Sequence, residues 1–320
     1  MGWWHRMASN KQNSSYSLSQ AQKDHFLAHG FVRLPNCFTR EKAAEWTSDM
    51  WTRLGFSPND KSTWTSERIH MPHHRTEHVK TFAPKAWAGI CELLGGEERV
   101  AEESAMWSDA LIVNLGSEEW EGKEWPSPKE LYGWHVDGDF FVHFLDSREQ
   151  GLLVIPLFSD IVEHAGGTVV SPDAISLLAK HLYDHPEGVS PGMIPRGQTA
   201  PADGPGFYNS LIQQCHEFHE MTGNTGDVIL MHPLMVHSAS VNSLRIPRII
   251  TNPPVSLKEP FNFDRKDPKK YSLVERKTLQ ALGMDRLKGW KIVGDREYIV
   301  PERLRAQEQM KKKELERLGS

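Results

Sequence analysis

The stretch Gly226-Asp227-Val228-Ile229-Leu230-Met231-His232-Pro233-Leu234-Met235-Val236-His237 contains a short apolar run that ends at turn residues. A run of this length, bounded by Gly and Pro, is typical of a buried β-strand. Similar runs occur at residues 110–115, 151–158, 167–170 and 246–251. Short strands with Gly and Pro between them predict an antiparallel barrel or a two-sheet sandwich from about residue 107 to residue 254.

Helical patterns flank this β-rich region. Residues 17–29 predict a helix that stops at Gly30, and a strand is expected at 31–34. A second amphipathic helix is expected to begin at Thr39 and to run to Gly55. Further helices are expected at 172–183, with Pro172 in the first turn, and at 301–318. The predicted fold is therefore mainly β with flanking helices.

The chain of 320 residues is long enough for one large domain with appended segments. We expect a disordered N-terminus at 1–16, a catalytic domain at 17–260 and a charged helical extension at 261–320. The final helix is predicted to be a solvated outer helix rather than a binding arm. Residues 187–205 are rich in Pro and Gly and lack apolar periodicity, which predicts a poorly ordered loop that buries little and covers a site.

Composition restricts the possible partners. The net charge is -5, which argues against a nucleic-acid-binding domain and favours a small-molecule substrate. No apolar run approaches the roughly 18 residues that a membrane span needs, so no membrane association is expected. The three cysteines are far apart and predict no disulfide framework. With no targeting signal recognised, we expect a cytoplasmic protein, either a monomer or a homodimer.

The residues that suggest chemistry lie in two segments. In Trp134-His135-Val136-Asp137 the histidine and aspartate alternate, so both side chains would project from one face of a strand. This pair alone is weak evidence, but His237 supplies a second imidazole. Two imidazoles and one carboxylate form the facial triad of non-haem iron(II) oxygenases, which leaves positions open for co-substrate and O2. His232 remains an alternative to His237 as the third ligand.

An arginine on the following strand completes the set. Arg248 lies at the centre of the apolar run 246–250, from which its guanidinium would clamp a dicarboxylate through a two-bond fork. Arg245 is the competing candidate.

The order and the amino-acid sequences of these segments resemble those of the phytanoyl-CoA dioxygenase family of Fe(II)- and 2-oxoglutarate-dependent oxygenases. The resemblance covers roughly residues 18–254. Its motifs are Leu18-Ser19-Gln20 with Gly30-Phe31-Val32, Trp134-His135-Val136-Asp137, Gly166-Gly167-Thr168, and Gly226-Asp227 through His237 to Arg248. The resemblance implies a double-stranded β-helix, the jelly-roll core also found in cupins.

For the site, the resemblance implies His135, Asp137 and His237 as iron ligands and Arg248 as the grip on 2-oxoglutarate. Thr168 and Asn114 match positions near the co-substrate. The implied reaction oxidises a C-H bond of a small organic molecule with O2, by hydroxylation or a related outcome, and releases succinate and CO2. Halogenation is disfavoured, because related halogenases have Gly or Ala at the position of Asp137.

The sequence departs from the family pattern in two places. Val169-Val170-Ser171-Pro172-Asp173-Ala174 follows Gly-Gly-Thr where Pro-Gly-Ser-His is frequent, and Ala239 stands where a serine is common. The departures leave the substrate and the details of co-substrate binding open. Two alternative functions also remain: a cupin-like metal enzyme that does not use 2-oxoglutarate, and a non-catalytic binding protein.

The remaining histidines and aromatic residues are expected to have mainly structural roles. His70, His73, His74 and His78 are expected in a loop near the pocket entrance. His216 and His219, beside Cys215, are expected in a polar strand or turn, because neither group offers four closed zinc ligands. Aromatic and histidine residues around the first segment are expected to be mostly core, namely Trp134, Phe140, Phe141, His143 and Phe144.

Overall fold

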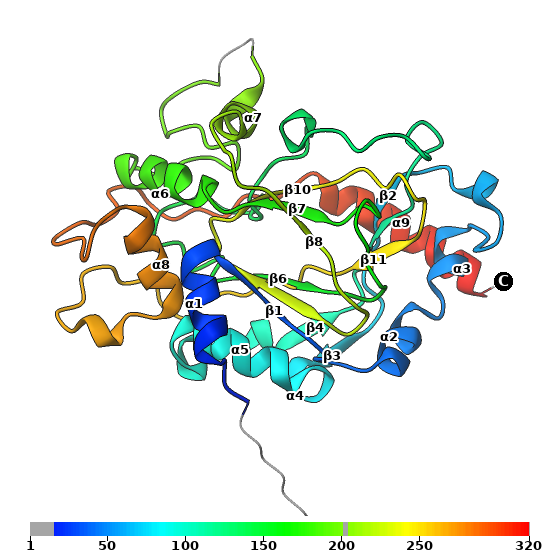
Figure 1. The fold of residues 1–320 in the computed structure, drawn as a ribbon, viewed down its shortest axis with the longest axis horizontal. Helices are drawn as coiled ribbons and strands as arrows, with labels where there is room; N and C mark the ends of the chain where they lie inside the picture. Colours follow the sequence, from blue (N-terminus) through cyan, green and yellow to red (C-terminus); the bar gives the residue numbers. More distant parts are fainter. Residues whose placement is uncertain (1–15, 201–203, 320) are drawn as a thin grey trace, which may run out of the picture.

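The computed structural model describes residues 16–200 and 204–319. The expected disordered segment at 1–16 therefore lies outside the described residues except for its last position, Tyr16. Antiparallel strands form the centre of the molecule and helices surround them (Figure 1). This arrangement agrees with the predicted sheet core and flanking helices.

The larger layer of strands combines two three-stranded sheets. One has the order β1-β9-β6 and the other β11-β5-β2. Their bounds are Phe31–Leu34 for β1, Val228–Met231 for β9, Leu153–Pro156 for β6, Arg248–Ile250 for β11, Ile112–Asn114 for β5 and Arg68–His70 for β2. An isolated antiparallel bridge between Leu157 and Ile250 joins β6 to β11. The layer therefore continues as β1-β9-β6-β11-β5-β2.

The second layer has the order β10-β7-β8, with bounds Val236–Ala239, Thr168–Ser171 and His219–Met221. An isolated bridge between His135 and His237 adds the segment around His135 beside β10. In Figure 1, β7 and β10 lie above β1 and β6, so the strands form two layers. A small separate sheet pairs β3 (Thr76–His78) with β4 (Met106–Ser108).

Local sequence explains how α1 (Gln20–His29) begins and ends. The Ser19 hydroxyl accepts a hydrogen bond from the Gln22 backbone, and the Gln22 side chain accepts one from the Ser19 backbone. This reciprocal pair satisfies two N-terminal donors that the helix leaves free. Gly30 ends the helix at φ 76°, a conformation that glycine adopts without steric cost. The predicted helix, its glycine cap and the strand β1 are confirmed.

The remaining helices lie outside the two layers. Their bounds are Arg40–Thr47 for α2, Met50–Leu54 for α3, Val79–Phe82 for α4, Pro84–Leu94 for α5, Ala174–Asp184 for α6, Gly206–Ile212 for α7, Leu273–Ala281 for α8 and Arg303–Gly319 for α9. Single-turn 3-10 helices lie at Lys61–Thr63, Glu97–Arg99, Glu102–Ala105, Pro128–Glu130 and Pro268–Lys270. Helix α6 begins two residues after the predicted start at Pro172.

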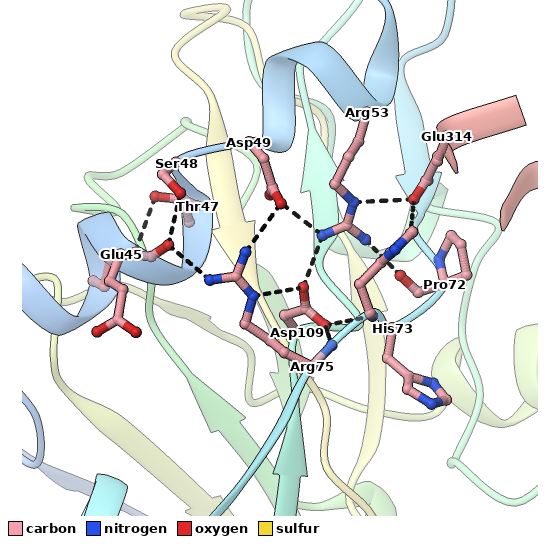
Figure 2. Close-up of polar contacts among 12 residues, drawn as sticks. Glu45, Thr47, Ser48, Asp49, Arg53, Pro72, His73, Arg75, Asp109 and Glu314 are labelled. Carbon is pink, nitrogen blue, oxygen red and sulfur yellow. Dashed lines mark hydrogen bonds and ion pairs between the residues drawn. The ribbon is translucent and has the colours of Figure 1, made fainter. Parts of the chain in front are cut away.

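The single helix expected between Thr39 and Gly55 is wrong, because the chain forms α2 and α3 with a break between them. Near the break, Ser48 donates its hydroxyl to the Glu45 carbonyl, and Arg75 donates to the same carbonyl. Such competition for helix carbonyls weakens the regular hydrogen-bond ladder. Figure 2 shows Arg75 reaching this end of α2 and Asp49 at the start of α3.

The segment 187–205 forms a loop, as predicted, but the expectation that it buries little is wrong for its first half. Val189 and Met193 are fully buried. Val189 exchanges two backbone hydrogen bonds with His143, and Arg196 donates its backbone N-H to the Gly188 carbonyl. These contacts anchor the loop to the chain that follows the His135 segment. Residues 201–203 lie outside the described part.

The described part of the chain contains no helix that is long and apolar enough to cross a membrane. Cys37, Cys91 and Cys215 are buried and free of disulfides.

Helix α9 does not fit the prediction of a purely solvated outer helix. Most of its side chains are exposed, but Glu314 is 1% exposed. Its carboxylate lies 3.0 Å from Nε of Arg53 and 2.7 Å from Nε2 of His74. Arg53 also pairs with Asp109 at 2.9 Å, and both of these side chains are fully buried (Figure 2). The helix is therefore joined to α3 through a buried ionic cluster.

Removal of the Glu314 carboxylate should destabilise the protein strongly. The Glu314→Ala variant leaves the buried Arg53 guanidinium with one acidic partner fewer, and breaking a buried pair costs about 3 to 5 kcal/mol. Urea unfolding of the parent and variant measures the loss. Glu316→Ala, on the exposed side of the same helix, is the matched control and should change stability by less than about 0.5 kcal/mol. Equal losses in the two variants would contradict this role for Glu314.

Candidate active site

The structure brings together the three residues that the sequence singled out. His135 precedes Asp137 by two residues, and His237 lies in β10, which bridges the His135 segment. The distance from Asp137 Oδ1 is 3.6 Å to His135 Nε2 and 3.7 Å to His237 Nε2. These atoms lie within 4.8 Å of one another, and the cluster is among the groups in the described chain that could hold a metal ion.

Backbone carbonyls fix both imidazole rings. Nδ1 of His135 lies 2.6 Å from the Gly133 carbonyl, and Nδ1 of His237 lies 3.0 Å from the Met235 carbonyl. A carbonyl only accepts, so each Nδ1 carries the proton and donates it. Each Nε2 then faces Asp137 and is the ring atom left to bind a metal ion. Metal-binding histidines commonly donate their other ring N-H to a backbone carbonyl in this way, which fixes the orientation of the ring.

The three groups differ in their exposure. His135 keeps 48% of its side-chain surface accessible, Asp137 keeps 25% and His237 keeps 9%. Desolvation is nevertheless the largest influence on the pKa of His135, because protein surrounds the ring closely. The accessible surface of His135 and Asp137 leaves the ligand atoms reachable from solvent. The cluster is thus open to small molecules on one side.

Burial and the neighbouring charges shift the pKa values of all three groups. Burial favours the neutral form of Asp137, but its pairing with His135 and the charges of both histidines outweigh burial and lower the pKa of Asp137 below the ordinary value. For His135, burial is outweighed by the bond to Asp137 and its charge, so the pKa is raised. Burial, together with repulsion from His135, lowers the pKa of His237 to about 4. At neutral pH, the group contains an ionised carboxylate and a neutral His237.

His232, the rival third ligand, points into the core instead. The chain does not continue as one extended strand: β9 ends at Met231, a turn follows, and β10 begins at Val236. The His232 ring is fully buried, its Nδ1 accepts from the Leu234 backbone, and its Nε2 lies 2.9 Å from the Thr278 hydroxyl. That hydroxyl donates to the Val274 carbonyl, so Nε2 of His232 must donate to it. His232 is a satisfied core histidine.

This neutral histidine predicts an acid-sensitive stability. Burial lowers the pKa of His232 to about 3, whereas the unfolded chain takes up the proton near pH 6.5. The unfolded state therefore binds more protons between these values, and stability falls as the pH drops from 6.5 toward 3. Between pH 6.5 and 5 the loss from this residue is about 2 kcal/mol.

Urea unfolding at several pH values measures the effect. The His232→Gln variant has no imidazole to protonate there, so its stability should fall less steeply by about that amount. His216→Gln, at an exposed position, should keep the parental slope. A parental slope in His232→Gln would show that His232 does not cause the acid sensitivity.

Arg248 is a buried cation without an acidic partner. Its side chain is 2% exposed, Nε donates to the Gly166 carbonyl at 2.7 Å and Nη1 to the Ile112 carbonyl at 3.5 Å. Within residues 16–200 and 204–319, no carboxylate lies at ion-pair distance from it. Burial and repulsion from Arg68 lower its pKa to about 10, so it remains charged at neutral pH. The charge of Glu220 acts on Arg248 without forming an ion pair, and a buried charge that lacks a direct partner is costly and calls for an anion.

Arg248 also links the two layers of strands. It begins β11 in the larger layer, while Gly166 leads into β7 in the second. Arg245, the competing candidate, lies before the strand. Its guanidinium pairs with Glu121 at 3.2 Å and lies 5.5 Å from the Trp64 ring. Arg245 therefore already has an acidic partner.

Thr168 and Asn114 have different surroundings. Thr168 is opposite Ala239 in register, and Val170 is opposite His237, so Thr168 shares a face of the layer with His237. Its hydroxyl makes no hydrogen bond to the described residues. Asn114 is opposite Arg248, but its amide donates to Ser240 and accepts from the Gly116 backbone. Asn114 holds the surrounding backbone in place.

Several residues near the cluster were missed by sequence reasoning. Arg68 in β2 is exposed, and its charge acts on His135, His70 and Arg248. From β2, Arg68 lies opposite Asn114, on the same sheet as Arg248. The position of Arg68 near the cluster follows from the strand register, which the sequence alone does not give.

Two further residues reach the ligand segment from distant elements. Burial and the charge of Asp137 raise the pKa of Tyr208 in α7, and its hydroxyl donates to the Pro191 carbonyl at 3.2 Å. Arg303 in α9 forms a two-bond ion pair with Asp139, at 2.5 and 2.8 Å. Neither contact has a local sequence signal.

The aromatic neighbours of the ligand segment and the remaining histidines agree only in part with the prediction. Most aromatic neighbours are core, as predicted: Trp134, Phe141, His143 and Phe144 are buried. Phe140 instead lines a cavity of about 550 Å³ with Tyr298. His70 lies in strand β2 rather than in a loop, and His74 joins the ionic cluster with Glu314. His219 begins strand β8, as expected of a polar strand.

The sequence matches no known family model and no curated protein. Solved structures offer weak likenesses. EctD from S. alaskensis with 2-oxoglutarate and 5-hydroxyectoine is 16% identical, covers 78% of this chain and 78% of its own, and has a TM-score of 0.42. HygX from Streptomyces hygroscopicus with nickel, 2-oxoglutarate and hygromycin B is 11% identical, covers 75% and 88%, and has a TM-score of 0.41.

A third likeness is SnoK from nogalamycin biosynthesis, described as a non-heme alpha ketoglutarate dependent carbocyclase. It is 13% identical, covers 75% of this chain and 84% of its own, and has a TM-score of 0.39. Because these TM-scores are below 0.5, the function proposed below rests on the geometry of the site. Membership of the phytanoyl-CoA dioxygenase family stays a prediction.

Proposed function

We propose that this protein is a non-haem Fe(II)- and 2-oxoglutarate-dependent dioxygenase with His135, Asp137 and His237 as iron ligands. The observation that carries the proposal is the buried Arg248, which has no ion-pair partner among the described residues and whose charge acts on His70 together with that of His135 from the cluster of two imidazoles and one carboxylate. The cluster alone suits several metals. A buried cation that needs an anion selects a co-substrate with a carboxylate.

The donor set suits an iron ion. Metal bonds of about 2.0 to 2.2 Å place neighbouring ligand atoms about 3 to 3.5 Å apart. The distances from Asp137 Oδ1 to Nε2 of His135 and of His237, 3.6 and 3.7 Å, are close to this range. Three protein ligands on one side leave further positions for small molecules. When bound, iron(II) would activate O2 for oxidation of a C-H bond.

The remaining residues would position 2-oxoglutarate. Arg248 would hold the distal carboxylate through a planar fork, and the Thr168 hydroxyl is free to donate a hydrogen bond beside it. Asn114 would act indirectly by keeping the β5 and Gly166 backbones in place. Asp137 also bears on the outcome, because its carboxylate occupies the position that halogenases leave free for chloride.

We further propose that the two antiparallel layers form a double-stranded β-helix, as the resemblance to the phytanoyl-CoA dioxygenase family implies. The strand order supports this, since the cluster lies where the His135 segment joins β10 in the second layer. The substrate would be a small organic molecule, and the products would include succinate and CO2. A cupin-like enzyme that does not use 2-oxoglutarate would have no need for Arg248 in this position.

Succinate formation tests the proposed activity. Purified protein with Fe(II), 2-oxoglutarate and air should release succinate slowly even without substrate, above a control that lacks protein. The release should stop without O2 and in Asp137→Ala. Addition of small organic molecules that bind as substrates should accelerate it. No succinate under any of these conditions would favour the cupin-like enzyme or the non-catalytic binding protein.

A further inference from the structure

A second cluster of potential metal ligands lies where the end of α1 meets the start of β8. His29 is the last residue of α1, His219 is the first residue of β8, and Glu217 precedes that strand by two residues. Oε1 of Glu217 is 2.7 Å from Nδ1 of His29 and 2.8 Å from Nε2 of His219. All three ligand atoms lie within 4.8 Å of one another.

The chemistry of this cluster suits a divalent metal of the zinc type. Imidazole nitrogen and carboxylate oxygen are the common zinc ligands apart from cysteine. Burial favours the neutral form of Glu217, but its hydrogen bonds to His219 and His29 outweigh this and lower its pKa. The carboxylate is therefore ionised at neutral pH. Both imidazole nitrogens already face the same carboxylate oxygen.

The surroundings leave room for the ion and its water. The side chains of His29, Glu217 and His219 are 37 to 40% exposed, so an ion has access from solvent. A cavity of about 490 Å³ borders the cluster and is lined by His219, His25 and Phe31. The His25 ring centroid lies 4.7 Å from that of His29, which provides another nearby imidazole.

We propose that His29, Glu217 and His219 form a zinc-binding site that clamps the end of α1 to β8, independent of the iron site. The sequence had grouped His219 with Cys215 and His216 instead. In the structure, Cys215 is buried, and the exposed His216 donates only its backbone N-H, to Asp173. The partner of His219 is on α1, nearly two hundred residues away, which explains why spacing did not reveal it.

A neighbouring cation should weaken the site. Lys277 in α8 donates to the Ala28 carbonyl at 2.6 Å, next to His29, and its charge acts on Glu217. An ammonium close to the carboxylate opposes a second positive charge there. Lys277→Gln should therefore bind zinc several-fold more tightly than the parent. Unchanged or weaker binding in this variant would contradict the proposed position of the ion.

The test is a zinc titration that separates the two clusters. The His135→Ala/His237→Ala double variant disables the first cluster, and isothermal titration with Zn²⁺ should then show one remaining equivalent per chain. Adding His29→Gln, Glu217→Gln or His219→Gln to it should weaken that binding at least 100-fold. Adding His216→Gln, the matched control three residues from His219, should leave the affinity unchanged.

Circular dichroism verifies that each protein is folded, and the three ligand substitutions provide independent tests if one of them unfolds. The proposal is overturned if the double variant binds no zinc, or if the ligand substitutions bind it as tightly as the His216→Gln control. Neither outcome bears on the iron site, because two of its three ligands, His135 and His237, are absent from all of the titrated proteins. A loss of iron binding by the parent, in turn, would leave the zinc result intact.

Discussion

Replacement of Asp137 or His237 with alanine is expected to reduce bound iron from one equivalent per chain to almost none. Each substitution removes one of three ligands, and Asp137 also supplies the only negative charge of the set. His135→Ala should behave in the same way. Metal analysis of protein loaded with Fe(II) without oxygen and then desalted measures the effect, and succinate formation should fall with it.

Two histidines serve as controls for this experiment. His70 in β2 is close enough for the charge of His135 to act on it, yet it lies outside the cluster. His70→Ala should therefore retain iron. His232→Gln should retain it too, because His232 is hydrogen-bonded to Thr278 in the core. If His237→Ala kept its iron and His232→Gln lost it, the third ligand would be assigned wrongly.

The Arg248→Ala variant should bind 2-oxoglutarate roughly a hundredfold more weakly while iron stays in place. Hydrogen bonds to charged groups contribute about 1.5 to 3 kcal/mol each, so loss of a two-bond fork costs about 3 kcal/mol or more. Arg248→Lys should recover only part of the affinity, because an ammonium cannot form the planar fork. Titration of the iron-loaded proteins with 2-oxoglutarate measures the dissociation constants.

Arg245→Ala is the matched control, since Arg245 is also buried but pairs with Glu121. It should keep the parental affinity for 2-oxoglutarate, although it loses an ion pair. Impaired binding in Arg245→Ala together with normal binding in Arg248→Ala would transfer the role to Arg245.

Local sequence was sufficient for features that short-range physics decides. The capping residues of α1 and the apolar run of β9 lie within a few positions of the elements they define. His135 and Asp137 do lie together, as their alternation predicted, although His135 is in an isolated bridge and Asp137 in a bend rather than in the expected strand. His237 was harder to assign as the third ligand, because the sequence does not show that a turn separates β9, which ends at Met231, from β10.

The features that were missed depend on contacts between distant segments. Arg303 meets Asp139, and Glu314 meets Arg53, across more than 160 residues in each case. Their residue types are ordinary on a solvated helix, so only the packing of α9 reveals their roles. The break between α2 and α3 likewise depends on Arg75, which donates to the Glu45 carbonyl from the segment that precedes β3. The burial of Val189 follows from its pairing with His143.

An anaerobic titration of the iron-loaded protein with 2-oxoglutarate is the most direct test of the proposed oxygenase site. It follows the charge-transfer absorption that develops when a keto acid chelates iron(II). The site described here predicts a band that saturates at one equivalent per chain, is absent in Asp137→Ala and needs roughly a hundredfold more 2-oxoglutarate in Arg248→Ala. A parent protein that holds one iron per chain but develops no such band would contradict the proposed site.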